Sequence, residues 1–157
     1  MRFAMALKII GVLLILFSTT MLPPLFIGLV ASDGAAAAFA TGFATTLFSG
    51  VVIWLLTRLS KGELSIRDGF VVTALFWLVL GLFGAIPFWL SPQLALSPTE
   101  AIFESISGLT TTGATVITGL DELPRSVLFY RQFLQWLGGI GIIVLAVAIL
   151  PMLGIGG

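Results

Sequence analysis

Long apolar runs alternate with short polar connections along this chain. Four runs can be drawn, and they cover residues 9–30, 36–56, 69–90 and 124–150. Each is close to or above the roughly 20 residues that an α-helix needs to cross a hydrocarbon core about 30 Å thick. Pro23 and Pro24 lie inside the first run, so we expect a kinked helix with its kink at these prolines. The pattern predicts an all-α polytopic membrane protein.

The polar stretch between the third and fourth runs begins with helix-start signals. Ser97 is a strong N-cap residue, Pro98 suits the first helical position, and Glu100 stands where its side chain can close a capping box. A helix over residues 98–109 would be about 18 Å long at a rise of 1.5 Å per residue. Because that length cannot span a bilayer, such a helix would re-enter and stop partway. The negative end of its dipole would then favour a cation.

The run that follows this short helix is polar, with one central glycine: Leu109-Thr110-Thr111-Thr112-Gly113-Ala114-Thr115. Non-helical backbone at membrane depth is tolerated only where protein or a water-filled cavity surrounds it. The carbonyl oxygens of a strand over residues 110–114 could replace the hydration shell of a potassium ion. Gly113 permits backbone angles that a residue with a side chain resists, and the threonine hydroxyls could add ligands or brace the strand. The same spacing alone also fits a polar turn in an extracellular loop.

The composition indicates a membrane environment and argues against several classes of function. Hydrophobic residues make up 59% of the chain and charged residues 9%, against about 25% charged in a soluble domain. The formal net charge is zero and no basic block exists, so nucleic-acid binding is not expected. The chain has no cysteine and no histidine, no Gly-x-Ser-x-Gly motif, and no carboxylate pair within an apolar run. We therefore expect a protein of the lipid bilayer that is not an enzyme.

Basic residues predict the orientation in the membrane. They precede the first run and fill the loop between the second and third: Arg2, Lys8, Arg58, Lys61 and Arg67. Since basic residues collect on the cytoplasmic side, we expect a cytoplasmic N-terminus. The region from residue 91 to 124 would then lie outside and dip back into the membrane.

Two features near the short helix leave alternatives open. Glu104 could attract cations or form a buried brace to Arg131, and the brace is favoured because an unpaired carboxylate in a membrane is costly. Gly138, Gly139 and Gly141 in the fourth run favour close helix packing over a gating hinge.

Longer strings carry a resemblance to a known family. Residues 103–115 read Phe-Glu-Ser-Ile-Ser-Gly-Leu-Thr-Thr-Thr-Gly-Ala-Thr, and they resemble the first pore loop of the Trk/Ktr/HKT superfamily of potassium transporters. Residues 121–124 (Asp-Glu-Leu-Pro) and 129–142 narrow the resemblance to bacterial Trk-type subunits of the TrkH or TrkG kind. The likeness runs through the whole chain, including residues 67–70 (Arg-Asp-Gly-Phe).

The resemblance implies an architecture and a function. In this family four helix–pore-loop–helix repeats surround one ion pathway, and an extra helical hairpin precedes the first repeat. Residues 1–66 would be that hairpin and residues 67–157 the first repeat. The implied function is potassium uptake across the bacterial inner membrane, with the potassium ion as the bound species. The implied partners are membrane lipid, a cytoplasmic nucleotide-binding subunit of the TrkA type, and a second full-length transporter in a homodimer.

The resemblance also assigns residues to the site. Four fall on the selectivity filter: Thr110, Thr111, Thr112 and Gly113. The backbone oxygens of Thr111 and Thr112 are the strongest candidates for potassium ligands. Structural support of the pore loop is expected from Ser97, Glu104 and Arg131. Potassium channels carry Thr-Val-Gly-Tyr-Gly here, and this chain lacks the tyrosine and the second glycine. We therefore expect its outer ion sites to be less well formed than those of potassium channels.

One repeat supplies only a quarter of such a filter. Either the chain is a fragment of a longer transporter or four copies assemble, and we favour the fragment. The glycines in residues 153–157 read as a turn into a next segment. The other function class is a non-conducting membrane scaffold or assembly segment.

Overall fold

The computed structural model describes residues 2–60 and 66–152, and every regular element within them is helical. In chain order the elements are α1 (Arg2–Ser18), η1 (Thr19–Met21), α2 (Leu22–Ala31), α3 (Ala36–Thr57), α4 (Ile66–Gly84), α5 (Ile86–Leu90), α6 (Pro98–Leu109), η2 (Leu120–Glu122) and α7 (Arg125–Met152). Within these described ranges, four segments are long and apolar enough to cross a membrane: Phe3–Ala31, Ala36–Thr57, Asp68–Leu90 and Arg125–Val144. The predicted fold class is confirmed. Lys61 and the glycines of residues 153–157 lie outside the described residues.

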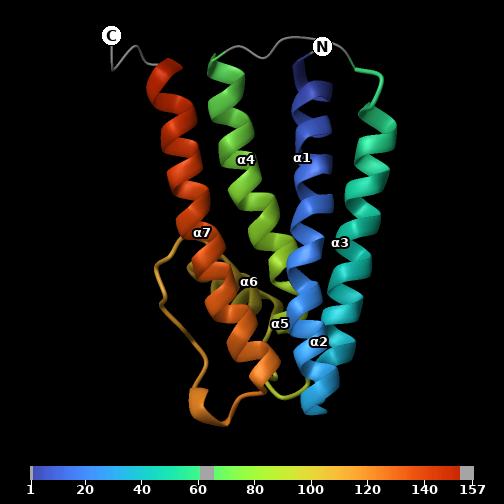
Figure 1. Ribbon diagram of the computed structural model, residues 1–157, viewed down its shortest axis with the longest axis vertical. Helices are drawn as coiled ribbons and strands as arrows, with labels where there is room; N and C mark the ends of the chain where they lie inside the picture. The colour runs from blue at the N-terminus through green and yellow to red at the C-terminus, as the bar shows by residue number, and fades with distance from the viewer. Residues whose placement is uncertain (1, 61–65, 153–157) are drawn as a thin grey trace.

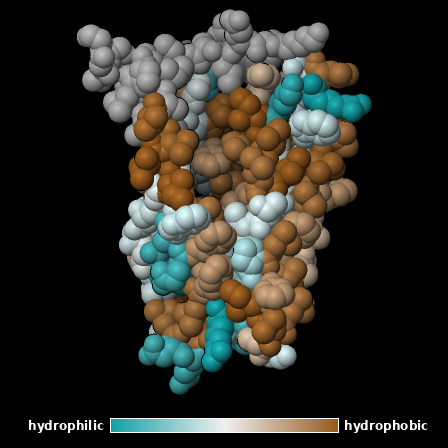
Figure 2. All heavy atoms as spheres, in the orientation of Figure 1, coloured by the Kyte–Doolittle hydropathy of each residue, from teal (hydrophilic) through white to brown (hydrophobic). Residues whose placement is uncertain are grey.

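The long helices run side by side along the long axis of the molecule (Figure 1). α1 packs most extensively against α3, and the short helix α6 contacts α4, α5 and α7. Figure 2 shows hydrophobic side chains over much of one face, with hydrophilic residues at its lower end, at its upper right and partway up. Large hydrophobic side chains that are exposed include Phe26, Phe48, Leu56, Ile143 and Val147. Such a surface fits a protein surrounded by lipid.

The first membrane-spanning segment is broken one turn before its paired prolines, not at them as predicted. Pro23 has no N–H to donate to the carbonyl of Thr19. That carbonyl instead accepts from the N–H of Leu22, which gives the 3₁₀ turn η1. Pro24 lies buried in the first turn of α2. The helix therefore adjusts on the N-terminal side of the prolines, where a 3₁₀ hydrogen bond replaces the one that Pro23 cannot donate.

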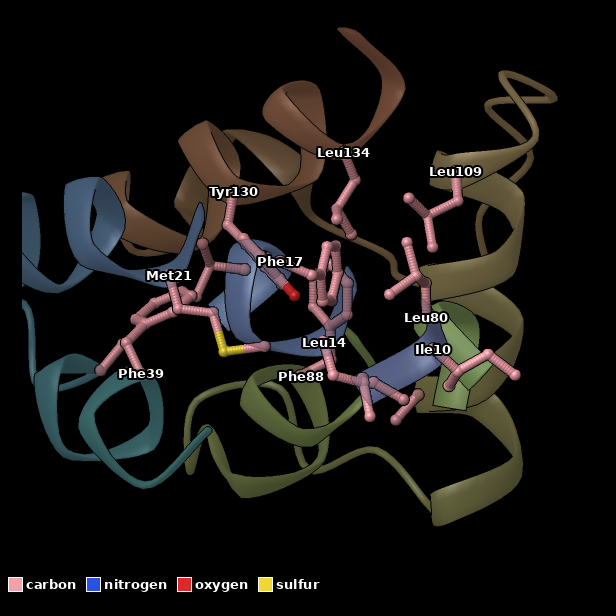
Figure 3. Close-up of a cluster of buried hydrophobic side chains, with 14 residues drawn as sticks. Ile10, Leu14, Phe17, Met21, Phe39, Leu80, Phe88, Leu109, Tyr130 and Leu134 are labelled. Carbon is pink, nitrogen blue, oxygen red and sulfur yellow. The ribbon is translucent and has the colours of Figure 1, made fainter. Parts of the chain in front are cut away.

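Tyr130 ties α7 to the break between α4 and α5. Its hydroxyl donates to the carbonyl oxygen of Gly84 over 2.8 Å, at the residue where α4 ends. The fully buried ring packs edge-on against Phe39, with centroids 5.2 Å apart, and against Phe88 at 5.1 Å. Figure 3 shows these rings in one cluster with Phe17 of α1. The first two spans and the segment around α6 thus share one hydrophobic core.

Asp33, in the turn between α2 and α3, caps the first turn of α7. Its Oδ2 accepts from the backbone N–H of Ser126 over 3.0 Å and from the Ser126 hydroxyl over 2.6 Å. Its Oδ1 accepts from the N–H of Ala35 over 3.0 Å. A carboxylate at this position also interacts favourably with the positive end of the helix dipole. The turn between α2 and α3 therefore fixes the start of α7.

We expect Asp33→Asn to destabilise the protein in a pH-dependent way. Partial burial opposes ionisation, but the hydrogen bonds from Ser126 and Ala35 outweigh it and hold the pKa of Asp33 below its ordinary value of 3.8. A lowered pKa means that the charge stabilises the fold above pH 3.8, and that this contribution is lost as the pH falls through the lowered pKa. At neutral pH the variant should lose about 1 kcal/mol, because an amide NH₂ group replaces one of the two carboxylate oxygens that accept these hydrogen bonds.

Thermal unfolding of the purified protein in detergent checks this expectation. Asp121→Asn, at an exposed acid near the start of the same helix, is the matched control. A deficit in Asp33→Asn that stays constant from neutral to strongly acidic pH would contradict the carboxylate's role as a cap.

Candidate functional site

The short helix α6 begins with the predicted capping box. The Ser97 hydroxyl accepts from the N–H of Glu100, and the Glu100 carboxylate accepts from the N–H of Ser97 over 2.8 Å. Pro98 occupies the first helical position. The 12 residues of α6 correspond to about 18 Å, which is too short to span a bilayer. Figure 1 shows the chain leaving α6 partway along the bundle and descending beside α7.

The C-terminal end of α6 closes differently from the prediction. Thr110 caps the helix and Thr111 follows in the left-handed region at φ 58°, so residues 110–114 form an irregular loop rather than the expected strand. The N–H of Thr111 bonds to the carbonyl of Gly108, and the N–H of Thr112 bonds to that of Ser107. This is the Schellman arrangement, in which a residue with positive φ lets the last helical carbonyls find donors. A β-branched residue is strained in that conformation, and such strain gathers at functional sites.

Glu104 and Arg131 form a buried ion pair behind the loop. The Arg131 Nε lies 3.0 Å from Glu104 Oε2, and the two residues are 6% and 1% exposed. Glu104 Oε1 accepts from the Thr115 hydroxyl and from the N–H of Val116, the latter over 2.6 Å. Arg131 Nη2 also donates to the carbonyl oxygen of Gly113 over 3.0 Å. One carboxylate and one guanidinium therefore connect α6, the loop and α7.

The carbonyl oxygens of the loop fall into two groups. Those of Gly113 and Ala114 accept hydrogen bonds, from Arg131 and from the Ser107 hydroxyl over 2.6 Å. Those of Thr111 and Thr112 accept none from the part of the chain that the structure describes, and both residues are exposed. Uncommitted oxygen ligands of this kind suit alkali cations rather than softer metals.

The threonine hydroxyls brace the loop. The Thr110 hydroxyl donates to the carbonyl of Ile106 over 2.8 Å and lies 2.9 Å from the Thr112 hydroxyl. Gly113 has φ 73°, a conformation that glycine adopts without strain. The bends at residues 111 and 113 give the loop its irregular path.

The end of α6 rests directly on the backbone of α7. A Cβ placed on Gly138 would lie 1.9 Å from the carbonyl oxygen of Leu109, so only glycine allows this approach. Gly139 faces more open space, with the Thr111 methyl carbon 3.9 Å from such a Cβ, and Gly141 meets the ring of Trp77 at 3.4 Å. α7 continues as a helix past all three glycines. The packing interpretation is therefore confirmed for Gly138, whereas a Cβ on Gly139 or Gly141 would make only ordinary van der Waals contacts.

The structure brings the predicted site residues together around the end of α6. Glu104 and Arg131 pair as favoured, and both contact the loop that carries Thr110 to Gly113. Ser97 lies at the other end of α6, where it caps the helix. Sequence reasoning did not assign Ser107 and Thr115, whose hydroxyls hold the loop. A single hydroxyl has no distinctive sequence signal, so only the folded loop identifies them.

Comparison with known proteins places this arrangement in a family. The sequence model of the TrkH family, described as a cation transport protein, matches residues 35–157. The chain belongs to the TrkH family of cation transport proteins. It is similar to the Trk system potassium uptake protein TrkH of Halomonas elongata, at 57% identity over 100% of this chain and 33% of that protein. The Escherichia coli K12 protein of the same name is 55% identical, over 100% of this chain and 32% of its own length.

A solved TrkH structure has the same fold. The crystal structure of the potassium transporter TrkH from Vibrio parahaemolyticus superposes with a TM-score of 0.93 and 57% identity, over 100% of this chain and 34% of that one. The chain therefore spans about a third of the length of the TrkH relatives it matches.

Proposed function

We propose that this chain supplies one quarter of a potassium-selective filter for potassium uptake. The observation that carries the proposal is the loop after α6, where the carbonyl oxygens of Thr111 and Thr112 are uncommitted while those of Gly113 and Ala114 are tied to protein groups. The short helix directs the negative end of its dipole toward these oxygens, which favours a cation. Relatives that carry potassium uptake in their names support potassium as the transported ion.

The pore itself requires more than these residues. We propose that residues 67–157 form one of four repeats in a longer transporter, and that residues 1–66 form a hairpin that precedes them. The length of the relatives, about three times the matched region, supports this division. Assembly of four copies of the chain is the alternative route to a closed filter.

Orientation and partners complete the proposal. The Lys8 ammonium donates to the carbonyl of Arg58 over 3.1 Å, which brings Lys8 of α1 and Arg58, the residue that follows α3, to the same end of the bundle. Basic residues favour the cytoplasmic side, so we place the N-terminus there and the loop after α6 toward the outer face of the bacterial inner membrane. A nucleotide-binding subunit of the TrkA type would bind on the cytoplasmic side, and two full-length transporters would form a homodimer.

Potassium uptake by a chimera tests the proposed function. This chain replaces the matching third of the Vibrio parahaemolyticus TrkH, and the product is expressed in cells that lack their own potassium uptake systems. We expect growth at low external potassium. Expression of the 157 residues alone is the control that separates the two assemblies, since rescue by the short chain would indicate a multimer. A chimera that reaches the membrane but takes up no potassium would favour the scaffold alternative.

Gly113→Ala in the same chimera should weaken the preference for potassium over sodium. A side chain at φ 73° costs roughly 1–2 kcal/mol and biases the loop away from its path. We therefore expect the ratio of potassium to sodium uptake to fall by up to about tenfold, the value reached when the loop bound to potassium alone carries a strain of about 1.4 kcal/mol. Gly119→Ala is the matched control, since Gly119 also has a positive φ, 69°, but lies in a distal turn. Unchanged selectivity in Gly113→Ala would contradict the filter assignment.

A further inference from the structure

Arg131 makes two contacts that a purely electrostatic brace would not need. Its Nε bonds to the Glu104 carboxylate, and its Nη2 separately donates to the carbonyl oxygen of Gly113 over 3.0 Å. Both bonds come from one planar guanidinium, so the position of the Glu104 carboxylate fixes the direction of the second bond. The guanidinium is almost fully buried, which strengthens the hydrogen bond and limits alternative partners.

The hydrogen bond from Arg131 to the Gly113 carbonyl affects which loop carbonyls remain available to an ion. An oxygen that accepts from a cationic N–H group has a positive charge close to it, which opposes the approach of a second cation. Ala114 is held similarly, since its carbonyl accepts from Ser107. Among residues 111–114, the carbonyls of Thr111 and Thr112 accept no hydrogen bond from the described part of the chain, and they lie immediately before the hydrogen-bonded carbonyls of Gly113 and Ala114.

We infer that Arg131 is a specificity-determining positioning residue: it withdraws the Gly113 carbonyl from ion coordination and ends the coordinating part of this loop at Thr112. The inference rests on the proposed function. Rotation of the peptide that joins Gly113 to Ala114 would turn the Gly113 carbonyl toward the ion path. Arg131 prevents that rotation by holding the oxygen from behind. The loop thereby presents a short set of oxygens at fixed spacing, and ions that need a different number or spacing are discriminated against.

Arg131→Lys separates this role from the ion pair. A lysine ammonium can still pair with Glu104, but it is a point charge without the rigid fork that reaches two acceptors. Arg125→Lys is the matched control, because it makes the same exchange six positions earlier on α7 at an exposed side chain. The double variant Glu104→Gln/Arg131→Gln removes both charges together, so it leaves no unpaired buried charge while also removing the guanidinium from Gly113.

The experiment measures membrane level, potassium uptake and inhibition by sodium for each variant in the chimera. We expect Arg131→Lys to reach the membrane and take up potassium, with potassium-over-sodium selectivity lowered about tenfold, the effect of losing one hydrogen bond to a charged group. The double variant should show the same loss, and Arg125→Lys should match the unmodified chimera.

Several results would overturn the inference. One is normal selectivity in Arg131→Lys or in the double variant. Another is equal loss of selectivity in Arg125→Lys. If neither Arg131 variant folds, the role of Arg131 is structural and the inference fails. If the unmodified chimera takes up no potassium, the proposed function itself fails. The unmodified chimera is measured first, so this failure is distinguished from a failure of the inference about Arg131.

Discussion

Replacing Gly138 with alanine is expected to abolish potassium uptake by the chimera. The added Cβ would lie 1.9 Å from the carbonyl oxygen of Leu109 and 2.7 Å from its carbonyl carbon. Both are backbone atoms at the end of α6, so no side-chain rotation relieves the overlap. Either α6 or α7 must move, and overpacking of this kind costs about 3 kcal/mol or more. Because the loop begins immediately after Leu109, any such movement displaces the proposed filter.

Gly139→Ala provides the matched control for this prediction. It makes the same chemical change one residue further along α7, where the nearest contact of the new Cβ is the Thr111 methyl carbon at 3.9 Å. We expect that variant to retain uptake and membrane level close to those of the unmodified chimera. The measurements are initial potassium uptake rates and the amount of folded protein by size-exclusion chromatography. Equal activity of the two variants would show that α6 does not depend on this close contact.

The helical plan of the molecule could be predicted from the sequence because it depends on local signals. Apolar run length identified the four segments of the described chain that are long and apolar enough to cross a membrane, and Ser97 with Glu100 identified the start of α6. The predicted position of the break in the first span was less accurate. The first span changes course in the turn before Pro23, because a proline removes the donor for a carbonyl four residues earlier.

The site could be predicted as a set of residues but not as a geometry. The high cost of an unpaired carboxylate in a membrane favoured the pairing of Glu104 with Arg131, and the two residues do pair. The positive φ of Thr111 could not be foreseen, since the αL position after a helix is usually glycine. Which carbonyls are clamped depends on contacts between residues 18 positions apart, such as Gly113 and Arg131, and sequence spacing does not report such contacts.

Glu104→Gln is expected to lower the amount of folded protein more than it lowers apparent potassium affinity. The substitution leaves the Arg131 guanidinium buried without its carboxylate partner, and breaking a buried pair in this way costs about 3–5 kcal/mol. It also removes a charged acceptor from the N–H of Val116 and from the Thr115 hydroxyl, which hold the chain after Gly113. The loop and α7 would lose a shared contact, so the loss of folded protein should be larger than any specific change in ion binding.

Glu100→Gln is the matched control, because it makes the same substitution four residues earlier on α6 at an exposed side chain. Hydrogen bonds from Ser97 lower the pKa of Glu100, so the carboxylate is the preferred capping form, but an amide oxygen can still accept those bonds. Folded yield after detergent extraction and the potassium concentration for half-maximal uptake should both be measured for the two variants. Normal yield of Glu104→Gln with weakened potassium affinity would contradict the brace, since that pattern belongs to a carboxylate that attracts the cation directly.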